Sequence, residues 1–176
     1  MKRLTISFLG LVLAAQGHAG GNAWGTASDL LAAGLPTLAA AYTYRDRDVD
    51  GAGQLAWTLG ATVASTELLK NQISETRPDQ SDNKSFPSGH TAVAFASARY
   101  LDKRYAGEVS PYLLYGAAGL TALARVQADK HYWKDTIAGA ALGYAWGEYF
   151  TETRAGGRVS LLPAARGMAV AWQRPW

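Results

Sequence analysis

The sequence predicts an all-α fold, an antiparallel bundle of about five to six helices, and three observations favour it. Stretches of 16 to 18 residues rich in Ala, Leu and other small or apolar residues recur five times along the chain. Short segments with Gly, Pro or several polar residues separate them, as expected for turns between helices. With 176 residues, 48% of them hydrophobic, the chain is long enough to bury one core and too short to expect two.

Residues 1–19 are typical of a signal peptide. Lys2 and Arg3 precede an apolar run at 4–15, and small residues up to Ala19 suit a cleavage site. An uncleaved helical anchor is the alternative, although the run is shorter than the ~20 residues that span a bilayer. Both interpretations predict export, and we expect a periplasmic location.

The helical domain is expected to cover residues 20–155. Gly51 and Gly53 separate the first two helices, the polar loop 79–85 ends at Pro87, and Gly107 marks a later turn. The helices are predicted at 28–44, 53–70, 88–104, 110–125 and 135–150.

Residues 156–176 differ from the rest of the chain. Val159 and Leu161, and later Met168, Val170 and Trp172, alternate with smaller or polar residues. This alternation favours a short β-hairpin, and an irregular tail lying on the bundle is the alternative.

The relation to a membrane stays open at this point. The longest uncharged runs are 15 or 16 residues long, which is less than the ~20 that a spanning helix needs. Gly139, Gly143 and Gly147 allow very close helix contact, which serves membrane bundles and tight soluble bundles equally well. Soluble, peripheral and integral forms are all compatible with this pattern.

Composition excludes several classes of function. Lys2 and Arg3 are two of the 17 basic residues; without them the charge against 14 acidic residues is near +1, which is no nucleic-acid footprint. The chain has no cysteine, hence no disulfide and no zinc–thiolate site. Beyond the signal segment only His90 and His131 remain, so we expect no metal site and no cofactor.

Three groups of polar residues are expected to meet at one end of the bundle. If the helices run alternately up and down, the end of the second and fourth helices and the start of the third and fifth share that end. The residues concerned are Lys70 with Arg77, Ser88-Gly89-His90, and Arg125 with His131 and Asp135.

These residue types suit a phosphate. Lys70, Arg77 and Arg125 supply three cations, and a guanidinium can pair with two phosphate oxygens at once. The helix start near Gly89 adds free N–H groups and lets a ligand approach closely. His131 and Asp135, four residues apart, would share one face of a helix, so that the carboxylate could hold one ring nitrogen while the other faces phosphorus.

His90 can fill the remaining role, because an imidazole on the phosphate-binding helix can protonate the departing alkoxide and later accept a proton from water. His131 as nucleophile and His90 as acid need opposite protonation states. We therefore expect a bell-shaped pH dependence.

The three groups resemble the three-part motif of the type 2 phosphatidic acid phosphatase (PAP2) superfamily, which includes bacterial acid phosphatases and vanadium haloperoxidases. The likeness runs from about residue 70 to residue 143 through the patterns KxxxxxxRP, PSGH and RxxxxxHxxxD. It implies a bundle of the PAP2 type. It also implies roles for eight residues: His131 as nucleophile, Asp135 as its orienting acid, His90 as proton donor, and Lys70, Arg77, Ser88, Gly89 and Arg125 as phosphate ligands.

One position departs from that motif, because the family usually has a serine before the arginine of the third part and this chain has Ala124. The missing hydroxyl would alter the grip on phosphate or the choice of substrate. Both histidines and all three cations are kept.

We therefore expect an exported, metal-independent phosphatase that hydrolyses phosphate monoesters through a phosphohistidine. Phosphorylated lipids are the expected substrate class, and lipid pyrophosphates and small soluble esters stay open. Two alternatives remain: a vanadate-dependent haloperoxidase, because vanadate would occupy the same ligands, and a non-catalytic phospholipid- or anion-binding protein.

Overall fold

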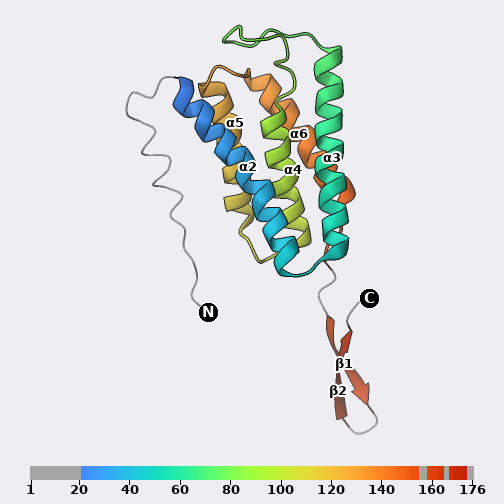
Figure 1. The fold of residues 1–176 in the computed structure, drawn as a ribbon. Coiled ribbons are helices and arrows are strands. Elements are labelled where there is room, and N and C mark those ends of the chain that lie inside the picture. The colour runs from blue at the N-terminus through green and yellow to red at the C-terminus, as the bar shows by residue number, and fades with distance from the viewer. Residues whose placement is uncertain (1–20, 155–157, 165–166, 174–176) are drawn as a thin grey trace.

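The computed structural model describes residues 21–154, 158–164 and 167–173 (Figure 1). The predicted signal peptide at 1–19 lies outside the described residues.

Five helices make up the bundle in the described part of the chain, and they run alternately up and down (Figure 1). The predicted all-α bundle is confirmed, and each predicted stretch corresponds to one helix. None of the helices described combines the length and the apolar content needed to cross a membrane. Their bounds are α2 Gly21–Arg45, α3 Val49–Gln72, α4 Gly89–Arg104, α5 Pro111–Gln127 and α6 Trp133–Phe150.

Helix α4 is the centre of the bundle and contacts the other four helices. Its alanines and two larger side chains, Tyr100 and Leu101, are completely buried. Around them lies an apolar core formed with Leu35, Ala39, Leu55, Leu114 and Ala118. Small residues along α4 allow its neighbours to approach closely, since no long side chain holds the backbones apart.

The closest approach is between α4 and α6. A methyl group added at Gly143 would collide with the backbone of Ala92, and one added at Gly139 would collide with the backbone carbonyl of Ser88. The repeated glycines therefore fix the start of α4 against the start of α6. Both helix starts belong to the end of the bundle where the predicted site residues gather.

The opposite end is closed by a buried polar network at the α2–α3 turn. Arg104 of α4 forms a bidentate ion pair with Asp48, at 2.6 and 2.8 Å, and both side chains are more than 90% buried. The hydrogen bonds from Arg104 lower the pKa of Asp48 to about 2. The Asp48 carboxylate also caps α3 by accepting from the backbone of Gly51 at 3.0 Å, so the turn is tied to the core.

The C-terminal segment forms the hairpin rather than the irregular tail. Strands β1 (Arg158–Ala164) and β2 (Gly167–Gln173) pair antiparallel, from Arg158 opposite Gln173 to Ala164 opposite Gly167. Figure 1 shows the hairpin beyond the end of the bundle that carries the α2–α3 turn.

Candidate active site

The three predicted groups meet at one end of the bundle, as helix direction required. The loop between α3 and α4 and the loop between α5 and α6 both cross this end (Figure 1). A cavity of about 540 Å³ opens below them between α2 and α3. Six of the eight predicted site residues line it: Lys70, Arg77, Gly89, His90, Arg125 and His131.

His131 is held in one orientation and one tautomer. Its side chain is 2% exposed, and its Nδ1 lies 2.7 Å from the backbone carbonyl of Ser85. Because a carbonyl oxygen can only accept, Nδ1 carries the proton and Nε2 keeps its lone pair. Nε2 lies 3.5 Å from Nη1 of Arg77, and both residues line the cavity.

Burial and the cations around His131 keep its imidazole neutral. Burial comes first and the charges of Arg125, Arg77 and Lys70 follow in lowering the pKa of His131 to about 3. An imidazole with such a pKa is unprotonated over the whole physiological range, which is the state that a nucleophile needs.

Asp135 acts on His131 indirectly. This corrects the prediction that its carboxylate holds a ring nitrogen of His131. Its Oδ2 lies 3.7 Å from Nδ1 of His131, too far for a hydrogen bond. Oδ2 instead accepts from Ser85 Oγ at 2.5 Å and from the backbone N–H of Tyr132 at 2.9 Å. His131 precedes α6, which begins at Trp133, so the two residues do not share a helix face. The fully buried Asp135 fixes the loop whose carbonyl orients the ring.

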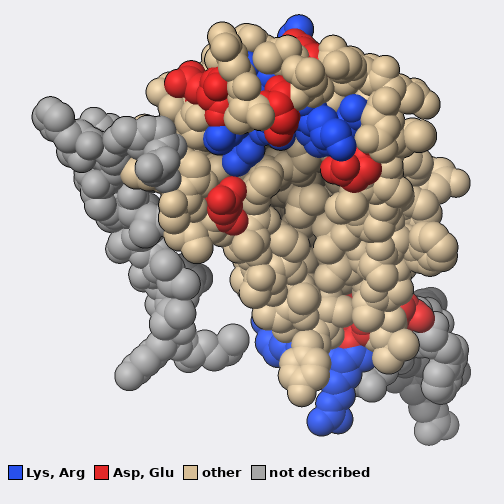
Figure 2. Space-filling model, turned by 45° about the horizontal axis from the view of Figure 1, so that its top comes forward, with Lys and Arg blue, Asp and Glu red and all other residues tan. Residues whose placement is uncertain are grey.

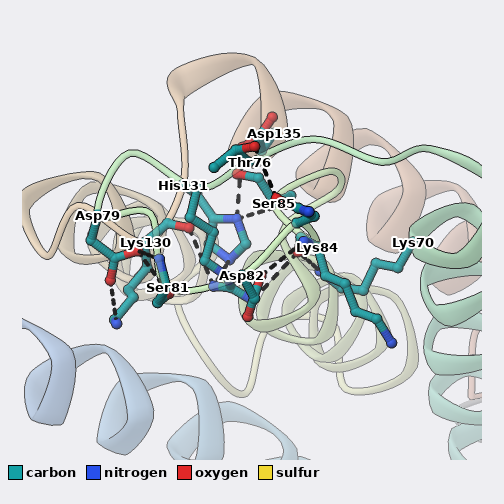
Figure 3. Close-up of polar contacts among 12 residues, drawn as sticks. Lys70, Thr76, Asp79, Ser81, Asp82, Lys84, Ser85, Lys130, His131 and Asp135 are labelled. Carbon is teal, nitrogen blue, oxygen red and sulfur yellow. Dashed lines mark hydrogen bonds and ion pairs between the residues drawn. The ribbon is translucent and has the colours of Figure 1, made fainter.

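Two of the cations are held by loop carbonyls (Figure 3). Arg77 donates from Nε to Asp82 at 2.7 Å and from Nη1 to the carbonyl of Lys130 at 3.2 Å. Lys70 donates to the carbonyl of Lys84 at 2.8 Å, and burial, followed by the charge of Arg77, lowers its pKa. Both cations are thus positioned in the free protein, which reduces the ordering cost of binding an anion.

The two loops are also tied to each other. Asp79, in the loop before α4, forms an ion pair with Lys130, in the loop before α6 (Figure 3). The backbone N–H of Asp79 donates to the carbonyl of Asp129 at 3.0 Å. Arg77 and His131 therefore keep their relative positions.

Arg125 is the third cation, and one of its N–H donors has no partner among the described residues. Its Nη1 lies 3.2 Å from Ser28 Oγ and 3.4 Å from Asp29, both on α2. Its buried Nε has no hydrogen-bond partner among the described residues. Leaving a buried N–H unpaired costs free energy, and Arg125 lines the cavity, so its guanidinium is a candidate ligand for an anion.

At Ala124, where the family usually has a serine, the missing hydroxyl is matched by another residue that contacts Arg125. Ala124 is 1% exposed in the interior. The hydroxyl that contacts Arg125 comes from Ser28 of α2, which is itself completely buried.

The start of α4 contributes differently from the prediction for Ser88. Gly89 lines the cavity, but the completely buried Ser88 hydroxyl pairs with Thr91 at 3.0 Å and is not among the lining residues. The Ser88 N–H donates to the carbonyl of Asp135 at 3.0 Å, so Ser88 joins α4 to α6. Its side chain is accordingly not placed as a phosphate ligand.

His90 is more open than His131, with 41% of its side chain exposed. Its Nε2 lies 3.1 Å from Oδ1 of Asp29. Burial and then Arg125 lower the pKa of His90, and the charge of Asp29 opposes them. The two histidines of the site therefore differ in exposure and in the groups that contact them.

Sequence reasoning missed Ser85, Ser28 and Asp29. Ser85 orients His131 through its backbone carbonyl, which has no signature in a sequence. Ser28 and Asp29 are about a hundred residues from Arg125 along the chain, and no local spacing connects them. Ser28 and Asp29 could be found only from the packing of α2 against α4 and α5.

Comparison with known proteins agrees with this geometry. Residues 51–155 match the family model of the PAP2 superfamily. The chain is 38% identical over 82 residues to a lipid A 1-phosphatase of Porphyromonas gingivalis, a match that covers 45% of this chain and 18% of the relative. It is 34% identical over 74 residues to lipid phosphate phosphatase 1 of Arabidopsis thaliana, covering 35% and 23%. The matches thus span less than a quarter of either relative.

Among solved structures, Aquifex aeolicus LpxE shares the fold. The TM-score is 0.52 at 23% sequence identity, and the match covers 69% of this chain and 84% of that one. The family model spans more than half of the chain and includes all eight predicted site residues. The chain is therefore a member of the PAP2 superfamily.

Proposed function

We propose that this protein is an exported phosphatase that hydrolyses the phosphate monoester of a lipid through a phosphohistidine at His131, without a metal ion. The observation that carries the proposal is the 2.7 Å contact between Nδ1 of His131 and the carbonyl of Ser85. This contact leaves Nε2 unprotonated beside Arg77, at the cavity, where a phosphorus atom can be attacked.

The reaction proceeds in two displacements. Nε2 of His131 attacks phosphorus, the bond from phosphorus to the ester oxygen breaks, and the departing oxygen takes a proton from His90. Water then attacks the phosphohistidine, His90 takes a proton from that water, and the P–N bond breaks to release inorganic phosphate.

The cations make a metal ion unnecessary in this scheme. Phosphoryl transfer requires stabilisation of charge on three equatorial oxygens. Lys70, Arg77 and Arg125 line the same cavity as His131 and supply positive charge there. The donor set is thus one that binds the phosphate directly, through guanidinium and ammonium groups.

The lower part of the cavity favours a lipid over a small ester. Below the cations the walls are apolar, with Ala32, Ala33 and Pro36 from α2 and Val63 from α3. Figure 1 shows α2 and α3 diverging from their turn toward the site, and Figure 2 shows a largely uncharged surface below the charged end. A phosphate at the cations would direct an attached alkyl chain into this groove.

Two further observations support a lipid substrate and the export of this protein. The matched relatives are named for lipid A and for lipid phosphates, which favours a phosphorylated lipid as the substrate class here. The basic and apolar segment at 1–19 supports transfer to the periplasm.

The test is phosphate release from phosphatidic acid in mixed micelles and from glycerol 3-phosphate, with and without EDTA. We expect release from the lipid that persists in EDTA and falls about a thousandfold or more in His131→Ala. Folding of the variant is checked by circular dichroism. The exposed Lys134, three residues away and outside the cavity lining, provides the matched control Lys134→Ala.

Two results would contradict the proposal. Release that needs a divalent cation contradicts the metal-free scheme, and a His131→Ala variant with parental turnover contradicts the nucleophile. A preference for glycerol 3-phosphate over the lipid would move the substrate class to soluble esters while leaving the chemistry in place.

A further inference from the structure

Helix α2 brings a carboxylate to the site from outside the matched family region. Asp29 lies outside residues 51–155 and outside the three polar groups. Its Oδ1 is 3.1 Å from Nε2 of His90 and 3.4 Å from Nη1 of Arg125. One carboxylate oxygen thus contacts both a proton donor and a phosphate ligand.

The charges around His90 make its contact with Asp29 important for the protonation of the imidazole. Lys70 on α3, Arg77 in the following loop and Arg125 on α5 all disfavour the protonated imidazole, and burial adds to them. Asp29 is the acidic group among the described residues that acts in the opposite direction. A residue that must deliver a proton therefore sits among three cations and has one carboxylate beside it.

We propose that Asp29 is a positioning residue for the reaction: its carboxylate accepts the Nε2–H of His90, favours the protonated imidazole in the free enzyme and holds it at the cavity edge. This inference rests on the proposed function, since it assumes that His90 is the proton donor. The buried Ser28 beside Asp29 shows that this part of α2 is docked on Arg125, so the carboxylate has a defined place although it is itself 63% exposed.

The contact predicts a change in pH dependence for Asp29→Asn. Because kcat/KM falls as pH rises through the pKa of His90 in the free enzyme, loss of the carboxylate moves this limb to lower pH. For a partly exposed pair the shift is about half to one pH unit. Above the pKa of His90, kcat/KM is then about three- to tenfold lower than in the parent, and at low pH it is not reduced.

The experiment measures kcat/KM against pH for the parent, Asp29→Asn, Asp29→Glu and Asp50→Asn. Asp50 is an exposed aspartate at the opposite end of the bundle, and its variant serves as the matched control. We expect the shift in Asp29→Asn alone, with Asp29→Glu restoring most of it. An equal loss of kcat/KM at every pH would indicate a purely structural role and would overturn the inference.

A second readout does not depend on turnover. Only His90 and His131 lie beyond residue 19 of a chain with three histidines, so the imidazole NMR signals are few and assignable through His90→Ala. The His90 titration should move to lower pH by the same half to one unit in Asp29→Asn. If the His90 titration does not move in Asp29→Asn, the proposed role of Asp29 is wrong.

The two proposals fail in different ways. If the parent releases phosphate and His131→Ala does not, an unmoved limb in Asp29→Asn overturns this inference alone. If the parent releases no phosphate from any substrate, the proposed function fails and this inference fails with it.

Discussion

The backbone carbonyl of Ser85 accepts a hydrogen bond from Nδ1 of His131, and the carboxylate of Asp135 in turn accepts one from the Ser85 hydroxyl. His131 is therefore oriented by a relay in which the loop before α4 lies between the ring and the acid. The spacing of His131 and Asp135 along the chain suggests a direct pair, whereas the measured separation of 3.7 Å makes Asp135 a support for the loop.

Ser85→Ala tests this relay. The substitution removes one partner of a completely buried carboxylate, and such a loss costs about 1–3 kcal/mol. We expect the free energy of unfolding in urea to fall by that amount and kcat to fall more than KM changes. Ser81→Ala is the matched control, because Ser81 is an exposed serine of the same loop. A Ser85→Ala variant with parental stability and kcat would contradict the relay.

The pH profile of kcat/KM is expected to be bell-shaped with a maximum on the acidic side of neutrality. His131 reacts when neutral, so activity falls as pH drops toward its pKa of about 3. His90 donates when protonated, so activity falls as pH rises through a pKa that burial and Arg125 hold below the ordinary 6.5. Initial rates between pH 3 and 9 check both limbs. A flat profile would count against this division of roles.

His90→Ala should discriminate between leaving groups. A nitrophenolate leaves without a proton, whereas the alkoxide of phosphatidic acid needs one. We expect the variant to lose about a hundredfold or more in kcat/KM on phosphatidic acid and much less on para-nitrophenyl phosphate. Equal losses on both substrates would show that His90 does not protonate the leaving group.

Ala33→Trp should separate lipid from soluble substrates. Ala33 lines the apolar part of the cavity between α2 and α3, and a large side chain there would occupy the path proposed for an alkyl chain. We expect KM for phosphatidic acid to rise several-fold while that for para-nitrophenyl phosphate stays within about twofold. Ala41→Trp, on an exposed part of α2 outside the cavity lining, is the control. Parallel changes on both substrates would contradict a chain in the groove.

Gly143→Ala should destabilise the bundle. The added methyl group would collide with the backbone of Ala92, which cannot move without displacing α4. We expect a loss of about 1–3 kcal/mol, read as a lower Tm. At Gly116 of α5 nothing lies within 4 Å of an added methyl, so Gly116→Ala should raise stability by about 0.5–1 kcal/mol. Equal effects of the two substitutions would contradict the close packing of α4 on α6.

Sequence reasoning found the helices because their apolar content and turn residues are local signals. It placed Lys70, Arg77, Arg125 and the two histidines at one end because alternating helix direction brings the ends of α3 and α5 and the starts of α4 and α6 together. It did not indicate the contact of the fully buried Ser88 hydroxyl with Thr91, which only the structure shows.

The sequence by itself determined the helical bundle, the family motif and the set of charged and histidine groups, since each depends on residue type and spacing along the chain. The tertiary structure decided how those groups act. The tautomer of His131 follows from a carbonyl that side-chain identity does not encode, and the surroundings of His90 follow from Asp29 on a helix sixty residues away. Contacts of this kind arise when helices pack, because only burial and close approach bring such distant backbone and side-chain atoms within hydrogen-bond range.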